Sequence, residues 1–411
     1  MLKSNIFYST ITTISRLISG FFLIFILARI LTLSDFGILT YSLVFASLLV
    51  LIIEYGYSFK LSKDTAKNPS DISILTGTAI IVKLSLLSIV IIVLFILGIF
   101  EYPDPTTYKI LFILSISSIF NSFANHFLIP YRSIDRFDVE AKYVFINNIF
   151  LFGIVSLITY FSRNITAIAL GILCVRIIYS TFTARKFIND FGLKFSTANL
   201  LAELKQTFPY AAQIAVGTMY LNIDTIILKE FVSISDIGIY QAGMRAMVAA
   251  TIGLEIINSV LIPRLSSLVA EKKDQLIKLS TKLNLITIML GIVIALIVNI
   301  FSNQLIHLVY GEKFSRLSDY VIYFSIIIFL RYLAIIYGTL LTISDKQKIR
   351  TYGVLFTLLF IIIVDLLVIP TNGLYGALYT LIVAHIILIT IYVYFAYKEY
   401  KTFFLNINYV K

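Results

Sequence analysis

Charged residues and cysteine are both scarce in this chain. Only 13% of its 411 residues are charged, whereas soluble domains carry about 25%, so the chain is not an ordinary soluble globule. The single cysteine, Cys174, excludes an intramolecular disulfide, and nothing around it suggests a redox role. Three scattered histidines, His126, His307 and His385, lack the spacing of metal ligands. The sequence therefore predicts neither a metal site nor a cofactor.

Two motifs that would indicate other functions are also missing. No GxxxxGK[ST] pattern occurs, which argues against a built-in ATPase. A single lysine, Lys3, precedes the first apolar segment, and no A-x-A-like cleavage site follows it, so this segment is expected to be a retained helix. The longest polar connection, residues 184–207, is too short for a soluble catalytic domain.

Long apolar runs are what the chain has in abundance. Hydrophobic residues make up 59% of it, and runs such as "IVKLSLLSIVIIVLFILGIF" can cross a hydrocarbon core of about 30 Å at about 1.5 Å per residue. The pattern predicts an all-α polytopic protein of the lipid bilayer with about twelve transmembrane helices. The expected spans are 6–31, 36–58, 72–100, 107–130, 139–161, 165–188, 208–228, 236–262, 281–301, 319–343, 349–370 and 373–397.

Lysine and arginine are distributed unevenly between the connections. Only five lie in the connections after odd-numbered spans, whereas those after even-numbered spans and the termini are rich in them. The positive-inside rule then predicts that both termini are cytoplasmic. The same rule explains the net charge of +11, so no nucleic-acid partner is expected. The five cations on the other side are Lys109, Arg163, Lys229, Lys313 and Arg316.

A short pattern occurs twice, at equivalent places in the two halves. "ILTLSDFGIL" at 30–39 and "FVSISDIGIY" at 231–240 share S-D-x-G-I at an offset of 201 residues. Each copy opens the second span of its half, so we expect two six-helix lobes that run in the same direction and are related by an axis along the membrane normal. The expected lobes are 1–190 and 208–411, joined by a cytoplasmic linker, 191–207, within a loop that carries a short amphipathic surface helix.

Five cations lie about 9–12 residues inside their spans, where a charge costs at least about 2.5–3.5 kcal/mol on insertion scales. Such residues need an aqueous cavity, a counter-ion or an anionic ligand, whereas Arg29, near a span end, can reach the interface. The five are Arg16, Lys83, Arg176, Arg245 and Arg331.

Several spans also carry polar stripes at helical spacing. Arg16 lies on one in the first span, Gln213 and Asp224 on another, and Gln241 and Arg245 on a third. Such stripes either join helices to one another or line a shared cavity. Arginine binds phosphate oxygens well, so a sugar attached through a phosphate fits the second interpretation. The acids Glu54, Asp224, Glu255 and Asp365 lie deeper along their spans than the arginines, so we expect an anion site more than a set of ion pairs.

Three stretches carry a resemblance to a known family. They are "TITTISRLISGFFLIFILARIL", the "SDFGILTYS" that follows at once, and "YLNIDTIILKEFVSISDIGIYQAGMR". With the twelve spans, they resemble the polysaccharide flippases, the O-antigen (Wzx-type) branch of the multidrug/oligosaccharidyl-lipid/polysaccharide (MOP) exporter superfamily. The resemblance implies two lobes in a V-shaped, MATE-like arrangement. It also implies a bacterial inner-membrane flippase that moves undecaprenyl-diphosphate-linked oligosaccharide to the periplasmic leaflet by alternating access, and passes it to polysaccharide polymerase and chain-length machinery.

The resemblance also assigns roles to residues. Arg16 and Arg245 match the family's cationic cavity positions, and Asp224 matches the acid of the second-half motif. Coupling to H⁺ or Na⁺ is expected, with Glu54 and Glu255 added as ion-coupling candidates from their location. The remaining expected substrate-binding residues are Lys83, Arg176, Arg331, Gln213 and Gln241.

Three alternatives stay open. A multidrug exporter of the same superfamily would favour acids at the midplane, and a lipid II flippase usually carries two further C-terminal spans. An O-antigen polymerase or ligase would be an enzyme, but such enzymes tend to carry large periplasmic loops. Here the largest loop on that side, 302–318, is small, so we expect a transporter without enzymatic activity.

Overall fold

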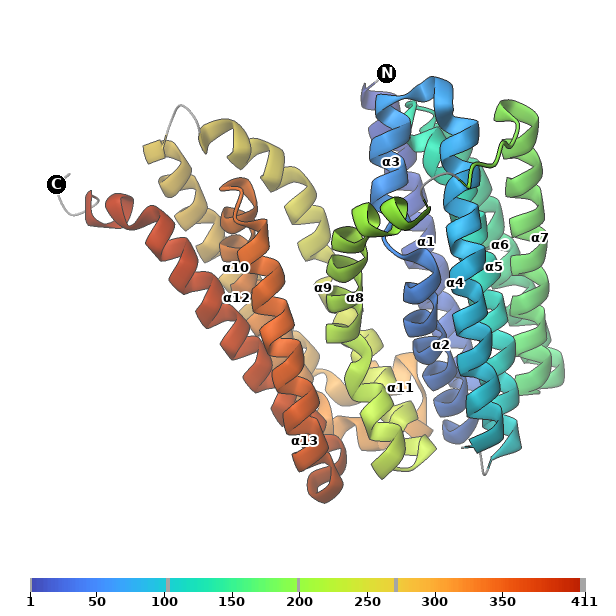
Figure 1. Ribbon diagram of the computed structural model, residues 1–411. Helices are drawn as coiled ribbons and strands as arrows, with labels where there is room; N and C mark the ends of the chain where they lie inside the picture. Colours follow the sequence, from blue (N-terminus) through green and yellow to red (C-terminus); the bar gives the residue numbers. More distant parts are fainter. Residues whose placement is uncertain (1, 101–103, 198–199, 270–272, 407–411) are drawn as a thin grey trace. The chain divides into compact units, whose positions relative to one another are not determined.

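The computed structural model describes residues 2–100, 104–197, 200–269 and 273–406, and all regular structure in these ranges is helical (Figure 1). The predicted all-α architecture is confirmed. The helices are α1 (Leu2–Ile30), α2 (Leu33–Glu54), α3 (Tyr57–Lys67), η1 (Pro69–Asp71), α4 (Ile72–Phe100), α5 (Pro105–Ser133), α6 (Phe137–Ser162), α7 (Ile165–Phe191), α8 (Leu200–Phe231), α9 (Ile234–Val269), α10 (Lys273–Ile300), α11 (Ser302–Val309), η2 (Glu312–Tyr320), α12 (Val321–Ile343) and α13 (Gln347–Asn406).

The number of long helices agrees with the predicted spans. In the described part of the chain, 10 helical segments are long and apolar enough to cross a membrane. One of them, within α13, contains two helices that meet at Gly373, where φ is +54°. The 36-residue α9 is a further helix of sufficient length, since it extends about 54 Å at 1.5 Å per residue. Together these make about twelve spans, as expected for a multi-pass membrane protein.

The chain forms two compact units, residues 1–218 (unit 1) and 219–411 (unit 2). In unit 1, α5 packs against α2 and α7, and α1 packs against α6 (Figure 1). In unit 2, α12 packs against α9, α10 and α13. The lobe limits expected at 190 and 208 stay a prediction; the two compact units divide within α8.

The two copies of the repeated pattern adopt the same local structure. Thr32 precedes α2, and its hydroxyl accepts a hydrogen bond from the Asp35 amide (3.1 Å) and donates one to the Asp35 carboxylate (2.7 Å). Before α9, Ser233 and Asp236 make the same pair of bonds, at 3.2 and 2.7 Å. Each pair therefore satisfies a free amide of the first turn and fixes where the helix begins. The pattern encodes one helix start, used twice.

The helices that follow these two starts differ. After α2, Tyr55 and Gly56 both have positive φ (41° and 78°), and the chain restarts as α3. The backbone of α8 lies against Gly56, whose missing side chain would meet the Ala211 nitrogen at 2.5 Å. Glu203 of α8 accepts hydrogen bonds from Lys60 (2.6 Å) and Tyr57 (3.3 Å) on α3. The linker expected at 191–207 therefore contains the start of α8, which begins at Leu200 and contacts α3.

Candidate functional site

Unit 1 contains two polar cavities that share Arg16 and Asn125. We call them the Arg176 cavity, of about 260 Å³, and the Lys83 cavity, of about 230 Å³. The Arg176 cavity is lined by Arg16, Ser19, Gly20, Leu23, Asn121, Asn125, Val144, Asn147, Asn148, Leu151, Arg176 and Tyr179. The Lys83 cavity is lined by Arg16, Glu54, Tyr57, Ser58, Lys83, Ser122, Asn125, His126, Ile129 and Arg132. Three of the five predicted in-span cations thus line two polar cavities that share residues.

Arg16, at the middle of α1, has a carboxylate partner. Its guanidinium lies 3.7 Å from Glu140 of α6, and its side chain is 49% exposed. Arg132 holds the same carboxylate by two contacts, at 3.0 and 3.1 Å. Arg16 thus makes an ion pair with Glu140, which lies in the first turn of α6, and its place in the expected anion site stays a prediction. One carboxylate shared by two arginines still leaves a positive charge beside both cavities.

Arg176 of α7 is held by an amide instead of a carboxylate. Its Nη1 donates a hydrogen bond to Oδ1 of Asn121 on α5. Asn147 and Asn148 of α6 are almost fully buried at the same cavity, and Oδ1 of Asn147 has no hydrogen-bond partner within the described residues. A neutral partner leaves the guanidinium charge uncompensated, so a bound anion gains more from it than from a paired arginine.

Lys83 of α4 is almost fully buried. Its Nζ donates to the Ser122 hydroxyl (2.8 Å) and the Ser122 carbonyl (3.2 Å), and it lies 5.1 Å from the centre of the Phe123 ring. Glu54 lines the same cavity and interacts with this ammonium electrostatically. In all, four cations, Arg16, Lys83, Arg132 and Arg176, stand against two carboxylates, Glu54 and Glu140. The region is therefore net cationic.

The predicted polar residues of the second half have different surroundings. Gln241 is buried and donates to the Thr225 hydroxyl at 2.6 Å, which joins α9 to α8. Arg245 is half-buried near Tyr310, and its Nε has no hydrogen-bond partner within the described residues. Arg331 interacts electrostatically with Tyr220 and His385.

Gln213, on the unit 1 part of α8, is exposed. It does not line either cavity of unit 1.

The candidate ion-coupling acids separate into two environments. Asp224 is buried on α8 and accepts a hydrogen bond from Tyr240 at 2.7 Å. Asp365 of α13 is fully buried and interacts electrostatically with Asp224. Glu54, by contrast, lies beside Lys83 in unit 1. The side chain of Glu255 lies outside the described part.

Sequence reasoning missed five groups of this site: Arg132, Glu140, Asn121, Asn147 and Asn148. Arg132 and Glu140 were overlooked because they lie at helix ends, where charges are unremarkable. The adjacent pair Asn147–Asn148 in the middle of an apolar span was a usable signal, since two amides there need polar partners. Within the described residues, no group of three or more His, Cys, Asp or Glu could hold a metal ion.

Comparison with known proteins reveals similarity along nearly the whole chain. The family of polysaccharide biosynthesis proteins matches residues 2–269. Capsular polysaccharide biosynthesis protein CapF of Staphylococcus aureus is 24% identical over 408 residues, which cover 96% of this chain and 99% of CapF. An inward-facing multidrug resistance MATE family transporter of the MOP superfamily aligns with a TM-score of 0.75 at 11% identity, over 95% of both chains. The D35N mutant of the Vibrio cholerae MATE transporter VcmN aligns with a TM-score of 0.63 at 13% identity, over 98% of this chain and 96% of that one.

Proposed function

Because the chain belongs to the polysaccharide biosynthesis protein family and shares its fold with MATE transporters of the MOP superfamily, we propose that it is a lipid-linked oligosaccharide flippase. The cargo is an oligosaccharide on a polyprenyl diphosphate, such as undecaprenyl diphosphate, carrying an O-antigen or similar repeat unit. It moves from the cytoplasmic to the outer leaflet by alternating access.

The net cationic, amide-rich region of unit 1 is the observation that carries this proposal. Arg16 and Arg176 offer planar donors that suit phosphate oxygens. Asn121, Asn147 and Asn148 on the same cavity offer amide groups that can bond sugar hydroxyls. A diphosphate joined to a sugar requires both kinds of group, and the Arg176 cavity supplies both.

The competing functions fit less well. An exported drug cation would be repelled by a region in which cations outnumber carboxylates. For a polymerase, the basic residues of 302–318 would have to converge on one site. Instead, His307 lies 3.3 Å from the exposed Glu312 and Arg316 pairs with Asp236 at 3.0 Å. These contacts support a transporter without enzymatic activity.

Ion coupling is the second part of the proposal. Asp224 and Asp365 are buried together in unit 2, and a shared proton or Na⁺ would lower the cost of burying two carboxylates. We assign coupling to this pair, with Glu54 and Glu255 as further candidates from the sequence. Lys83, Arg245, Arg331, Gln213 and Gln241 remain proposed cargo contacts.

The proposed location is the bacterial cytoplasmic (inner) membrane with both termini in the cytoplasm. The support is the asymmetry of lysine and arginine between connections. In this orientation the protein delivers cargo to the leaflet where polysaccharide polymerase and chain-length machinery would receive it.

A sidedness assay tests the proposal. Proteoliposomes would contain a short polyprenyl-diphosphate oligosaccharide, and a sugar-modifying reagent that cannot cross the bilayer would report the exposed pool. We expect the wild type to expose the inner pool, Arg176→Gln to fail, and Arg29→Gln to behave as wild type. Arg29 is the matched control because it is a cation near the end of its helix, outside both cavities. Wild-type protein that exposes no inner pool, or elongates the glycan, would overturn the proposal.

A further inference from the structure

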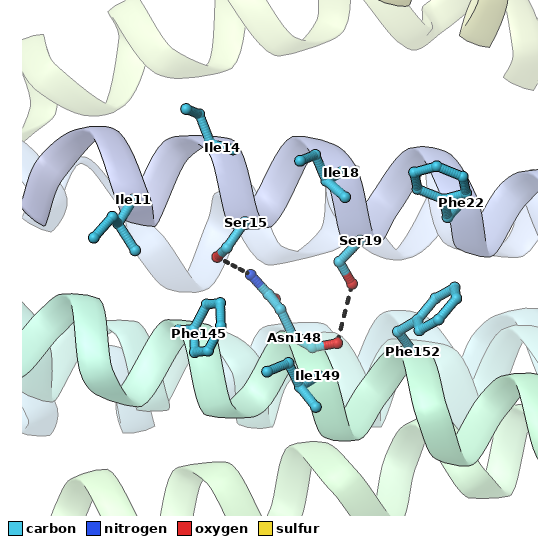
Figure 2. A pocket seen from close by; sticks show the side chains of 10 residues that line it. All are labelled: Ile11, Ile14, Ser15, Ile18, Ser19, Phe22, Phe145, Asn148, Ile149 and Phe152. Atoms are coloured by element: carbon cyan, nitrogen blue, oxygen red, sulfur yellow. Dashed lines mark hydrogen bonds between the residues drawn. The ribbon is translucent and has the colours of Figure 1, made fainter.

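A hydrophobic groove of about 330 Å³ runs between α1 and α6 in unit 1 (Figure 2). Its lining residues recur at helical spacing on both helices, so each helix presents one apolar stripe to it. The groove is open: Ile18 and Ile149 are each 53% exposed. Along α1 it extends from Ile11 to Phe22, which is roughly 16 Å at 1.5 Å per residue.

Three polar residues form the floor of this groove, and they are bonded to one another. Asn148 donates its side-chain N–H to the Ser15 hydroxyl (2.9 Å), and the Ser19 hydroxyl donates to the Asn148 carbonyl (3.0 Å), as Figure 2 shows. These groups bond within the α1–α6 contact, so what the groove offers a ligand is chiefly its apolar walls. An occupant of the groove is therefore a hydrocarbon.

The groove and the Arg176 cavity are the two sides of a single helix contact. Ser19 and Asn148 line both. Arg16 follows Ser15 directly in α1 and lines the cavity, as does Arg176. The hydrophobic groove thus adjoins the cationic Arg176 cavity, and the two are separated only by the contact between α1 and α6.

We propose that this groove binds the polyprenyl chain of the cargo while the diphosphate of the same molecule occupies the Arg176 cavity. The inference rests on the proposed function and adds to it a binding site for the lipid tail. The anionic diphosphate complements the positive charge of the Arg176 cavity, and the polyprenyl chain suits the apolar walls of the groove. The two parts of one amphiphile would meet at Ser19 and Asn148.

Photocrosslinking tests the tail site directly. The full chain would be placed in nanodiscs of phosphatidylglycerol and phosphatidylethanolamine, with geranylgeranyl diphosphate that carries a benzophenone at the end of its chain. Mass spectrometry would map the labelled residues, with and without excess inorganic pyrophosphate. We expect labelling in the groove, at residues such as Phe145 and Ile149, and we expect pyrophosphate to reduce it.

A groove-filling variant sharpens the test. Ile18→Trp combined with Ile149→Trp should lower the labelling about tenfold. This is the loss of affinity expected when about two methylene groups of the ligand are no longer buried. Ile92→Trp, on the exposed face of α4, is the control and should label as the wild type. Mapping on the wild type alone decides the question if the double variant does not fold.

Three results would overturn the inference, and they are distinguishable. Pyrophosphate-sensitive labelling outside the groove would leave the headgroup site standing and remove the tail site. Equal labelling of the groove by a benzophenone phosphatidylglycerol would make it an ordinary lipid site. No pyrophosphate-sensitive labelling anywhere would remove the proposed function together with this inference.

Discussion

Units 1 and 2 start their second long helix with the same capping arrangement, yet the charged groups inside them differ. In unit 1, Arg16, Lys83 and Arg176 line two polar cavities that share residues. In unit 2, two carboxylates, Asp224 and Asp365, are buried and interact electrostatically. Duplicated halves can thus keep the fold through a few turn residues while their interior chemistry diverges. The comparison is the basis on which we propose anion binding for unit 1 and ion coupling for unit 2.

The strongest way to break this comparison is to remove the cations of the Arg176 cavity. Arg16→Gln with Arg176→Gln should lower flipping about a hundredfold or more, since two charge-assisted contacts of about 1.5–3 kcal/mol each are lost. Arg245→Gln in unit 2 should lower flipping only about tenfold, because one such contact is lost. The sidedness assay measures both, at matched levels of inserted protein. An equal loss in the two variants would contradict the division of roles.

Neutralising the acids of unit 2 should have a different effect. Asp224→Asn should abolish the stimulation of flipping by an imposed ion gradient, because a neutral amide no longer exchanges an ion. Downhill flipping should fall by only about tenfold, because a single charge-assisted contact is lost. Tyr240→Phe is the control, since it removes the 2.7 Å hydrogen bond and keeps both carboxylates. Flipping by Asp224→Asn that still responds to the gradient would remove the acid from coupling.

The break between α2 and α3 gives a test of stability. Gly56→Ala should lower the free energy of unfolding by about 1–3 kcal/mol, because its φ of +78° is unfavourable for alanine and the new methyl group would meet the α8 backbone. Gly153→Ala, with nothing within 4 Å of the new carbon, should be neutral or stabilising. Thermal unfolding in detergent measures both. A neutral Gly56→Ala would show that α8 can withdraw from α3.

The smallest expected effect is at the repeated caps. Thr32→Ala and Ser233→Ala should each lower the free energy of unfolding by about 1 kcal/mol. The two values should agree because each substitution removes the same pair of hydrogen bonds. Thermal unfolding of the two single variants gives the comparison. Unequal losses would mean that the two caps share their geometry but stabilise the protein by different amounts.

The apolar runs were sufficient to predict the helices, because a bilayer requires every backbone group to be bonded within its segment. They were not sufficient for the break at Tyr55–Gly56, which depends on the later approach of α8. Nor could they reveal that α8 begins within the expected linker, since its polar first turns are stabilised by contacts such as Lys60–Glu203.

For the site, the cost of charge inside a span identified Arg16, Lys83 and Arg176 from the sequence. The cost of a buried charge does not indicate which groups contact these cations. Glu140 lies at the first turn of its helix, where an acid is common, so its contact with Arg16 becomes visible only when α1 and α6 are packed together. Gln241 is predicted from its stripe to contact cargo, and its buried hydrogen bond to Thr225 also joins two helices. Polar stripes alone do not distinguish the two uses.

The contact between α1 and α6 also constrains how the protein is made. Arg16 leaves the ribosome long before Glu140, and at about 5–20 residues per second the intervening 124 or so residues take roughly 6–25 s to synthesise. During that interval the first helix carries an unmatched guanidinium at its middle, and Ser15 lacks the Asn148 that follows it by 133 residues. The first helix to be synthesised thus waits for the fifth span, which supplies these partners for its polar side chains.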